Sequence, residues 1–488
     1  MKVLRNSVLS IGGSLAPVAI ALFTTPLLLA TIGPGRYGAL AIVWLLLGYF
    51  GQADFGIGRA ATQRIAQLGN DGQAVARVVW SAVLAVAAFG VVSGLLAYAL
   101  SWWFFSSVFQ SSDAIRTELL SSVGLIALCG PIVALFGVVN GCLQGQERFG
   151  VTSTANFVSN TCLPLFPLIA ALVLSEEMQV LIAASLAARV LGLAITLGGA
   201  WFHTLRRYTI RVARSEISHL FHVGKWIMVS GLVGPLMIVT DRLFIGVSIG
   251  AVAVAAYTIP FQVASRTLLF PIGIAQVLYP RLAAMDDLDA EQASQDYTVI
   301  VAALFLPVIV ALICFAEPLL KLWLGSSLDP RSIHVAQIVL AGIWINGVAN
   351  VPYSYLHARG QGRFVATLHL FELPVYLVLL VLLSSQFGLF GIAAAFSIRC
   401  FIDFWGMLFG AGAGLRQFVA SAWIGPVLLM AAFAVQSFET EPVTAFGLQS
   451  LVVAFAGAFA LWKTPADFWT ALRDRLAKRP SAVQSTLD

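Results

Sequence analysis

Residues 252–280 read VAVAAYTIPFQVASRTLLFPIGIAQVLYP, a long apolar run with a single charged residue, Arg266, near its centre. A membrane-spanning helix needs about 20 mainly apolar residues, so this run is long enough to cross a bilayer. A charge at membrane depth costs at least about 2.5 kcal/mol, and it is kept where it lines a polar cavity or meets a partner. The run therefore predicts a spanning helix whose arginine has a function or a partner.

The rest of the chain has the same apolar character. Of its 488 residues, 59% are hydrophobic and 10% are charged, whereas soluble proteins average about 25% charged. Hydropathy predicts about fourteen spanning segments with short connections, so we expect an all-α polytopic membrane protein without a soluble domain. The segments lie near residues 9–31, 37–57, 78–104, 119–143, 152–174, 180–202, 226–249, 252–280, 297–316, 334–356, 365–384, 390–409, 418–436 and 445–462.

The distribution of basic residues predicts the orientation. With the N-terminus inside, twenty Lys and Arg residues of the loops and tail fall on the cytoplasmic side, and four fall on the other: Arg36, Arg116, Lys321 and Arg331. Basic loops face the cytoplasm, so both termini are expected there. The net charge of +5 therefore reflects topology and gives no reason to expect a nucleic-acid partner.

Two matched pairs of short motifs indicate an internal repeat. Residues 145–149 read GQERF and residues 360–364 read GQGRF, 215 residues apart. At nearly the same spacing, residues 31–33 (TIG) end the first segment and residues 248–250 (SIG) end the seventh. An even number of helices per half predicts parallel repeats with the substrate path between them.

The repeat predicts the division of the chain. We expect an N-terminal six-helix lobe at 1–215, a C-terminal six-helix lobe at 216–417 and two added spanning helices at 418–462. Residues 463–488 combine apolar and basic positions in a pattern typical of a cytoplasmic interfacial helix and tail.

Arg266 lies on a polar stripe of its helix together with Gln262. No acid lies three or four residues from it, so its own helix offers no ion pair. Arg266 is therefore a candidate anion ligand. The alternative is a structural arginine that bonds to backbone carbonyls freed by Pro260 and Pro271.

Two further segments carry arginines with open interpretations. Asp241 and Arg242 are adjacent on one helix, and since sequence neighbours do not face each other there, each is expected to have a partner elsewhere. Asp241 could pair with Arg266 or belong to a transport site. Arg189 lies on a stripe of small residues that suits either helix packing or a cavity wall.

Three charged residues lie in the eleventh and twelfth segments. Arg399 and Asp403 are four residues apart and can neutralise each other. Glu372 is a lone acid two turns into its helix, where it could exchange protons for ion coupling or be a protonated acid bonded to a nearby helix.

The second segment ends in DFGIGR, residues 54–59. Asp54 is a candidate gating residue, and Arg59 and Arg64 could bind phosphate at the cytoplasmic mouth, although topology alone also places basic residues there. The five cysteines lie within predicted helices at no metal-like spacing, so we expect neither disulfide, metal site nor cofactor.

Motifs spread over nearly the whole chain carry a family resemblance. They are DFGIGR at 54–59, Asp241, Gly250 with Tyr257, YPRL at 279–282, PLLKLWLG at 318–325, and Gly388 with GIAAA at 391–395. In these motifs the chain resembles the polysaccharide transport family, which contains the oligosaccharide-lipid flippases of the MOP exporter superfamily.

The resemblance implies two six-helix lobes around a central cavity, in a bacterial inner-membrane protein. It implies transport of an undecaprenyl-pyrophosphate-linked oligosaccharide from the cytoplasmic to the periplasmic leaflet, with a polysaccharide polymerase or chain-length machinery as candidate partners. Cationic residues would hold the pyrophosphate, with Arg266 and Arg59 first. The further candidates are Arg242, Arg189, Arg64 and Gln262 for binding, and Asp54, Asp241, Glu372, Asp403 and Arg399 for coupling or gating.

Two other functions fit the sequence less well. An ion-coupled multidrug exporter of the same superfamily would favour acids over arginines in its cavity, and the arginine in residues 252–280 argues against it. A membrane glycosyltransferase or polymerase would carry catalytic residues on a large external loop, and the loops near 105–118 and 317–333 are short. No nucleotide-binding glycine loop or nucleophile constellation is found, so we do not expect ATP to drive the protein directly. We expect a transporter and no enzyme.

Overall fold

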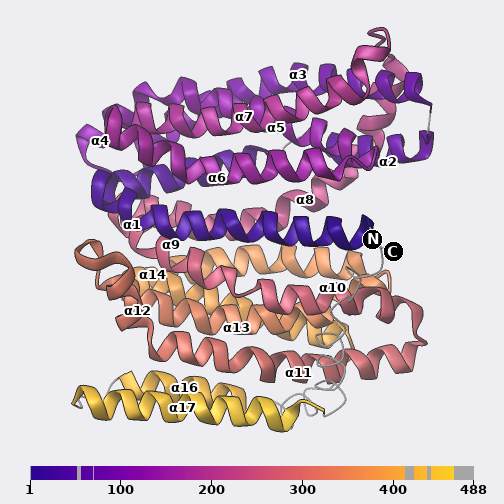
Figure 1. Ribbon diagram of the computed structural model, residues 1–488. Coiled ribbons are helices and arrows are strands. Elements are labelled where there is room, and N and C mark those ends of the chain that lie inside the picture. The colour runs from indigo at the N-terminus through magenta and orange to yellow at the C-terminus, as the bar shows by residue number, and fades with distance from the viewer. Residues whose placement is uncertain (1, 52–55, 70, 413–422, 437–440, 466–488) are drawn as a thin grey trace, which may run out of the picture. The chain divides into compact units, whose positions relative to one another are not determined.

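A computed structural model describes residues 2–51, 56–69, 71–412, 423–436 and 441–465. These residues fold into helices joined by short turns, with no strand among them, as the sequence predicts (Figure 1). The α-helices are α1 Lys2–Gly51, α2 Ile57–Leu68, α3 Gly72–Trp103, α4 Asp113–Ser121, α5 Val123–Gly145, α6 Phe149–Val173, α7 Met178–His203, α8 Arg214–Ser248, α9 Ala251–Arg266, α10 Leu269–Ala284, α11 Asp287–Cys314, α12 Ala316–Leu324, α13 Arg331–Ala358, α14 Gly362–Gly410, α16 Ile424–Gln436 and α17 Pro442–Lys463.

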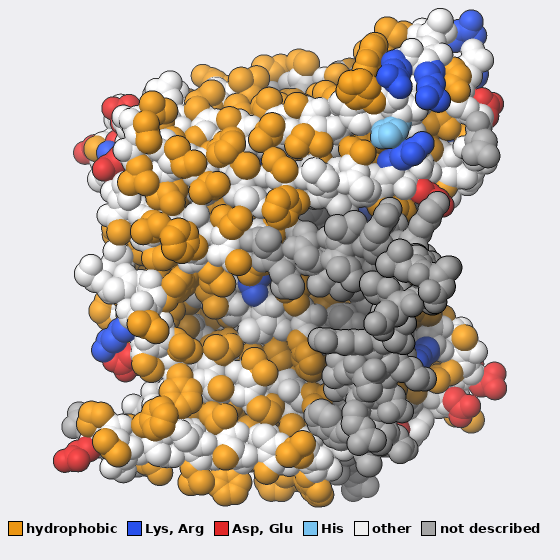
Figure 2. All heavy atoms as spheres, viewed as in Figure 1, with side chains coloured by type: hydrophobic (Ala, Val, Ile, Leu, Met, Phe, Trp, Pro, Cys, Tyr) orange, Lys and Arg blue, Asp and Glu red, His pale blue; other side chains and the backbone are white. Residues whose placement is uncertain are grey.

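The described part of the chain contains nine helices that are long and apolar enough to cross a membrane, or ten when the bent pair α9–α10 counts as one span. Two of them, α1 and α14, contain a glycine with non-helical backbone angles, Gly33 and Gly388, and each covers two of the segments that the sequence predicts. Figure 2 shows apolar side chains over much of the visible face and most of the visible charged side chains near its left and right edges, where helices end. The protein is therefore a multi-pass membrane protein, and the count of fourteen spans stays a prediction.

The chain forms two compact units. Unit 1 comprises Met1–Ile259 with Trp323–Ser332, and unit 2 comprises Pro260–Leu322 with Ile333–Asp488. The division at residues 259 and 260 differs from the lobe boundary expected at residue 215, and the lobes and added C-terminal helices stay predictions. The expected interfacial helix at 463–488 lies almost wholly outside the described residues.

In unit 1, α3 packs against α5, and α6 against α7 (Figure 1). Glycines allow close approach of helices: a side chain at Gly141 or Gly145 of α5 would collide with the backbone of α2, at Gly58 and Thr62 respectively. The spacing of the small residues on α5 thus serves helix packing. In unit 2, buried side chains of α10, α11, α13 and α14 form one apolar core.

The repeated motif lies at equivalent turns, one between α5 and α6 and one between α13 and α14. Each turn is a Schellman motif, whose backbone N–H to carbonyl bonds join Arg148 to Leu143 and Glu147 to Gln144, and Gln361 to Leu356 and Gly360 to His357. The residue with positive φ is Glu147 in one turn and Gly360 in the other. Their spacing, 360 − 147 = 213 residues, differs by two from the 215-residue spacing of the motif, so the sequence match and the turn geometry are in different registers.

Candidate functional site

The helix that the opening run predicts is broken beside its arginine. α9 ends at Arg266, α10 begins at Leu269, and the two are bent by 41°. Pro271 has no N–H to donate to the carbonyl of Thr267 four residues earlier, which weakens the helix at this point. The Thr267 carbonyl instead accepts a bond from the N–H of Phe270 at 3.2 Å. Arg266 therefore lies at the C-terminal end of one half-helix and next to the N-terminus of the other.

Arg266 is exposed, and its side chain makes no hydrogen bond or ion pair with the residues that the structure describes. The alternative of a structural arginine bonded to carbonyls freed by proline is therefore not supported for the described residues. Gln262, one turn earlier on α9, is half-buried, and its backbone carbonyl accepts the hydroxyl of Ser265 at 2.9 Å. An exposed guanidinium beside a helix N-terminus is suited to bind an anion, because the guanidinium and the helix N-terminus each carry positive charge.

Asp241 and Arg242 are buried and pair with each other. The Arg242 Nη1 lies 3.5 Å from Oδ1 of Asp241, and the same oxygen accepts the backbone N–H of Arg242 at 2.8 Å. The hydroxyl of Tyr257 donates to Oδ2 at 2.6 Å. Asp241 thus has a partner elsewhere in the chain, Tyr257, as expected. Its contact with Arg242 was not expected, and it forms because the short carboxylate turns back onto the next peptide. Both oxygens of Asp241 are occupied within unit 1, so a pair with Arg266 is not supported.

Arg189 bonds to α6. Its Nη1 donates to Ser159 Oγ and to Asn160 Oδ1, both at 3.1 Å. On the same stripe, a side chain at Gly192 would lie 2.7 Å from Cβ of Ser159. Of the two alternatives for this stripe, the contacts favour helix packing, with Arg189 held by neutral oxygens at the α6–α7 contact.

The basic residues of α2 differ in their contacts. Arg59 is exposed, whereas Arg64 makes two bonds to Glu216 at the start of α8, Nε to Oε2 at 3.1 Å and Nη2 to Oε1 at 3.0 Å. The bonds from Arg64 hold the pKa of the Glu216 carboxyl below its ordinary value. Arg64 is therefore engaged, and Arg59 is the more available cation of the pair. Asp54 lies outside the described residues.

The second group of candidates lies on the two halves of α14, which turn at Gly388. Glu372 precedes that turn by sixteen residues and Asp403 follows it by fifteen, so an antiparallel pair of half-helices places them at the same level. Added side chains at Gly406 and Gly410 would collide with Leu368 and Phe364, respectively. The two glycines thus let the half-helices approach closely enough for their polar residues to meet.

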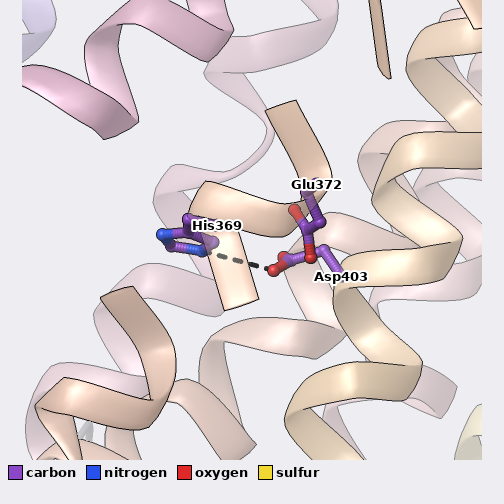
Figure 3. Close-up of side chains that lie close together, drawn as sticks. All are labelled: His369, Glu372 and Asp403. Atoms are coloured by element: carbon purple, nitrogen blue, oxygen red, sulfur yellow. Dashed lines mark ion pairs between the residues drawn. The ribbon is translucent and has the colours of Figure 1, made fainter. Parts of the chain in front are cut away.

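At that level, three side chains converge (Figure 3). The Nε2 of His369 lies 3.3 Å from Oδ1 of Asp403. Glu372 is 3% exposed, and no described N–H or O–H group donates to either of its carboxylate oxygens. One ligand atom from each of the three residues lies within 4.8 Å of the other two. The site therefore combines two buried carboxyl groups with an imidazole.

Arg399 does not form the expected ion pair with Asp403. The guanidinium instead lies over the rings of Tyr376 and Phe396, at 5.5 and 5.4 Å from their centroids, and its Nη2 is 3.5 Å from Sγ of Cys400. The expected pairing is wrong because aromatic faces attract this guanidinium, as cation–π contacts do in apolar surroundings. The partner of Asp403 is His369.

Sequence reasoning missed the part played by His369 and the bond between Arg64 and Glu216. The turn at Gly388 offered a signal for the first, because the distances along the chain from it place Glu372 opposite Asp403. The bond between Arg64 and Glu216 joins residues 152 positions apart, and helical periodicity carries no information over that separation.

Several solved membrane transporters are similar to this chain in fold. The lipid II flippase MurJ in an inward closed conformation matches 92% of this chain and 98% of its own, with a TM-score of 0.71 and 14% identity. An inward-facing multidrug resistance MATE family transporter of the MOP superfamily matches 87% of this chain and 99% of its own, with a TM-score of 0.64 and 16% identity. The fold is therefore that of the MOP superfamily of transporters.

Sequence comparison narrows the class. The polysaccharide biosynthesis protein family matches residues 28–332, more than half of the chain. A Shigella flexneri protein with the name "Putative O-antigen transporter" is 26% identical over 406 residues, which are 83% of this chain and 96% of that protein. The chain belongs to the polysaccharide biosynthesis protein family and has the fold of the MOP superfamily.

Proposed function

We propose that the protein is a flippase that moves a polyprenyl-pyrophosphate-linked oligosaccharide from the cytoplasmic to the periplasmic leaflet of the bacterial inner membrane. Its product would serve the biosynthesis of a surface polysaccharide such as O-antigen, capsule or exopolysaccharide. The name of the Shigella flexneri relative and the family match support this class of substrate. The protein would act as a transporter by alternating access, without a catalytic site.

The observation that carries the proposal is Arg266 at the break between α9 and α10. Discontinuous spanning helices bind anionic groups at the N-termini of their half-helices, and α10 begins three residues after this exposed guanidinium. A pyrophosphate has several oxygens that accept the planar, bidentate bonds of arginine. Arg266 would thus hold the anionic head of the lipid-linked substrate, with Gln262 as an added donor.

The remaining candidates take lesser parts in the proposal. Arg59, exposed on α2, would receive the head group at the predicted cytoplasmic side. Arg64, Arg189 and Arg242 would support the structure through the partners described above. Glu372 and Asp403 would take part in gating, because they meet where the two halves of α14 lie together. Asp54, Asp241 and Arg399 would contribute to gating.

The test is complementation of a strain that lacks its own flippase. We expect Arg266→Ala to abolish surface polysaccharide and to accumulate lipid-linked oligosaccharide, whereas Arg266→Lys keeps part of the activity because it retains the charge. Arg363→Ala removes an exposed arginine at the start of α14 and serves as the matched control, with activity unchanged. All three proteins are compared at equal membrane abundance.

Two outcomes would overturn the proposal. Full activity of Arg266→Ala would remove this residue as the anion ligand. Purified protein in liposomes that moves cationic drugs but no pyrophosphate-linked oligosaccharide would instead support an exporter.

A further inference from the structure

The convergence on α14 has a feature that the proposed transport of an oligosaccharide does not require. Glu372 is buried, and neither of its oxygens accepts a hydrogen bond from the described residues. Oδ1 of Asp403 likewise accepts none, although it faces the His369 ring. Buried polar atoms without partners are costly and rare, so a ligand that binds these oxygens would stabilise the protein.

The spacing of the three side chains fits a metal ion. Three atoms no more than 4.8 Å apart lie within about 2.8 Å of a common centre, against Zn²⁺ bonds of about 2.0–2.2 Å, so shifts of less than about 1 Å would complete the site. Tetrahedral ligands with bonds of about 2.1 Å lie about 3.4 Å apart, close to the 3.3 Å between His369 Nε2 and Asp403 Oδ1. Three protein ligands with an open fourth position are common for Zn²⁺.

The donor types narrow the choice of ion. Carboxylates alone suit Mg²⁺ and Ca²⁺, whereas an added imidazole favours Zn²⁺ and other divalent transition metals. A shared proton would need only the two carboxyl groups and leaves the role of His369 unexplained. The guanidinium of Arg399, the nearest arginine along the helix, lies over Tyr376 and Phe396 and forms no ion pair with either acid.

The position of the three side chains on α14 bears on how an ion would reach them and on what the ion would join. His369 lies seven residues after the start of α14 at Gly362, and Asp403 lies seven before its end at Gly410, which is about 10 Å from those ends. The side chain of His369 is 24% exposed, so the site is not sealed from the surface of the described residues. We propose that His369, Glu372 and Asp403 bind a divalent transition-metal ion, with Zn²⁺ as the best match, and that the ion clamps the two halves of α14.

Zn²⁺ binding to the purified, tag-free, full-length protein in detergent tests the proposal, with no transport assay needed. We expect about one Zn²⁺ per chain by competition with a chromophoric chelator, and a melting temperature that rises with Zn²⁺. His369→Gln and Glu372→Gln should each weaken binding at least ten-fold, an effect typical of ligand loss. Glu372→Gln preserves the side-chain volume and removes only the buried charge, so it is the variant that keeps the test valid if His369→Gln folds poorly.

His334→Gln is the matched control, because His334 lies in the same unit against Gln337 and Phe390. It should bind Zn²⁺ as the unaltered protein does. Absence of Zn²⁺ binding, or equal binding by His369→Gln, would overturn the proposal. So would a protein stabilised by Glu372→Gln that binds no Zn²⁺, which indicates a shared proton, or binding of Na⁺ in place of Zn²⁺. Zn²⁺ bound by a protein that moves no oligosaccharide would leave this inference intact and contradict only the proposed function.

Discussion

Gly141 on α5 sets the distance between α5 and α2, the helix that carries Arg59 and Arg64. A Cβ built there would lie 2.4 Å from the carbonyl oxygen of Gly58, whereas a carbon and an oxygen in contact lie about 3.3 Å apart or more. Gly141→Ala therefore has to move α2 away by about 1 Å. That movement also breaks the bond from the Thr62 hydroxyl to the carbonyl of residue 141, which is 2.8 Å long.

Three effects combine in the expected change that Gly141→Ala makes to the free energy of unfolding. Overpacking of a tight contact costs about 1–3 kcal/mol, and loss of the Thr62 hydrogen bond adds about 1 kcal/mol. Alanine is a better helix former than glycine by about 1 kcal/mol, which offsets part of this. We expect Gly141→Ala to lower the free energy of unfolding by about 1–3 kcal/mol. Backbone carbonyl groups cannot rotate away as side chains do, so the strain has no easy release.

Two measurements check the value. The first is the midpoint of SDS-induced unfolding in mixed micelles, compared with that of Gly198→Ala on α7, where nothing lies within 4 Å of the added carbon and a small gain is expected. The second is maleimide labelling of Cys142, which is fully buried beside Gly141, read out by mass spectrometry. Local opening should speed this labelling by about 5- to 150-fold for 1–3 kcal/mol. Equal midpoints for the two variants with unchanged labelling would refute the close contact.

Two further predictions concern unit 1. The pKa of Glu118 is held below its ordinary value, chiefly by the bonds from Arg36, so Glu118→Gln should cost about 1 kcal/mol at neutral pH. That difference should shrink as the pH falls below about 4.5 and the carboxylate takes up a proton, and melting curves of both proteins from pH 7 to 3 would show it; a constant difference would contradict it. The indole of Trp323 donates to the carbonyl of Leu22 at 2.7 Å, which Pro26 cannot bond to for lack of an N–H. Trp323→Phe should lower the free energy of unfolding by about 1 kcal/mol, and by clearly less in a Pro26→Ala background. A double-mutant cycle on the unfolding midpoint measures this coupling between the two positions, and its absence would contradict the prediction.

The spans could be predicted from sequence because hydropathy is a local property, and the apolar runs correspond to helices. The basic-residue count also placed Arg36 and the loop that contains Glu118 on one side, and the structure joins these two by an ion pair of 2.6 Å. Helix breaks were signalled by Gly33 and Gly388, where the backbone adopts positive φ. These features depend on residue type and order along the chain.

Side-chain partners were harder to predict. Helical periodicity gives the side of the helix on which a residue lies, but it does not give the rotamer that the side chain adopts. Asp241 has a short side chain that bonds to the next peptide and its arginine, against the expectation from the helical wheel. Arg399 has a long one that reaches two aromatic rings and leaves Asp403 to His369. The sequence therefore could show which segments carry the candidate site residues, whereas the structure was needed to show which side chains contact each other.

The contacts of the four membrane arginines argue for different roles. Each costs at least about 2.5 kcal/mol at membrane depth, and three of them have compensation: Arg189 from amide and hydroxyl oxygens, Arg242 from Asp241, and Arg399 from aromatic rings. Arg266 has no such bond among the described residues. It ends α9, where the negative end of the helix dipole favours a cation, but it also adjoins the positive N-terminus of α10, which repels one. An anion bound between the guanidinium and that N-terminus would turn this repulsion into two attractions, so a polyanionic head group is the ligand that we expect to gain most from the break.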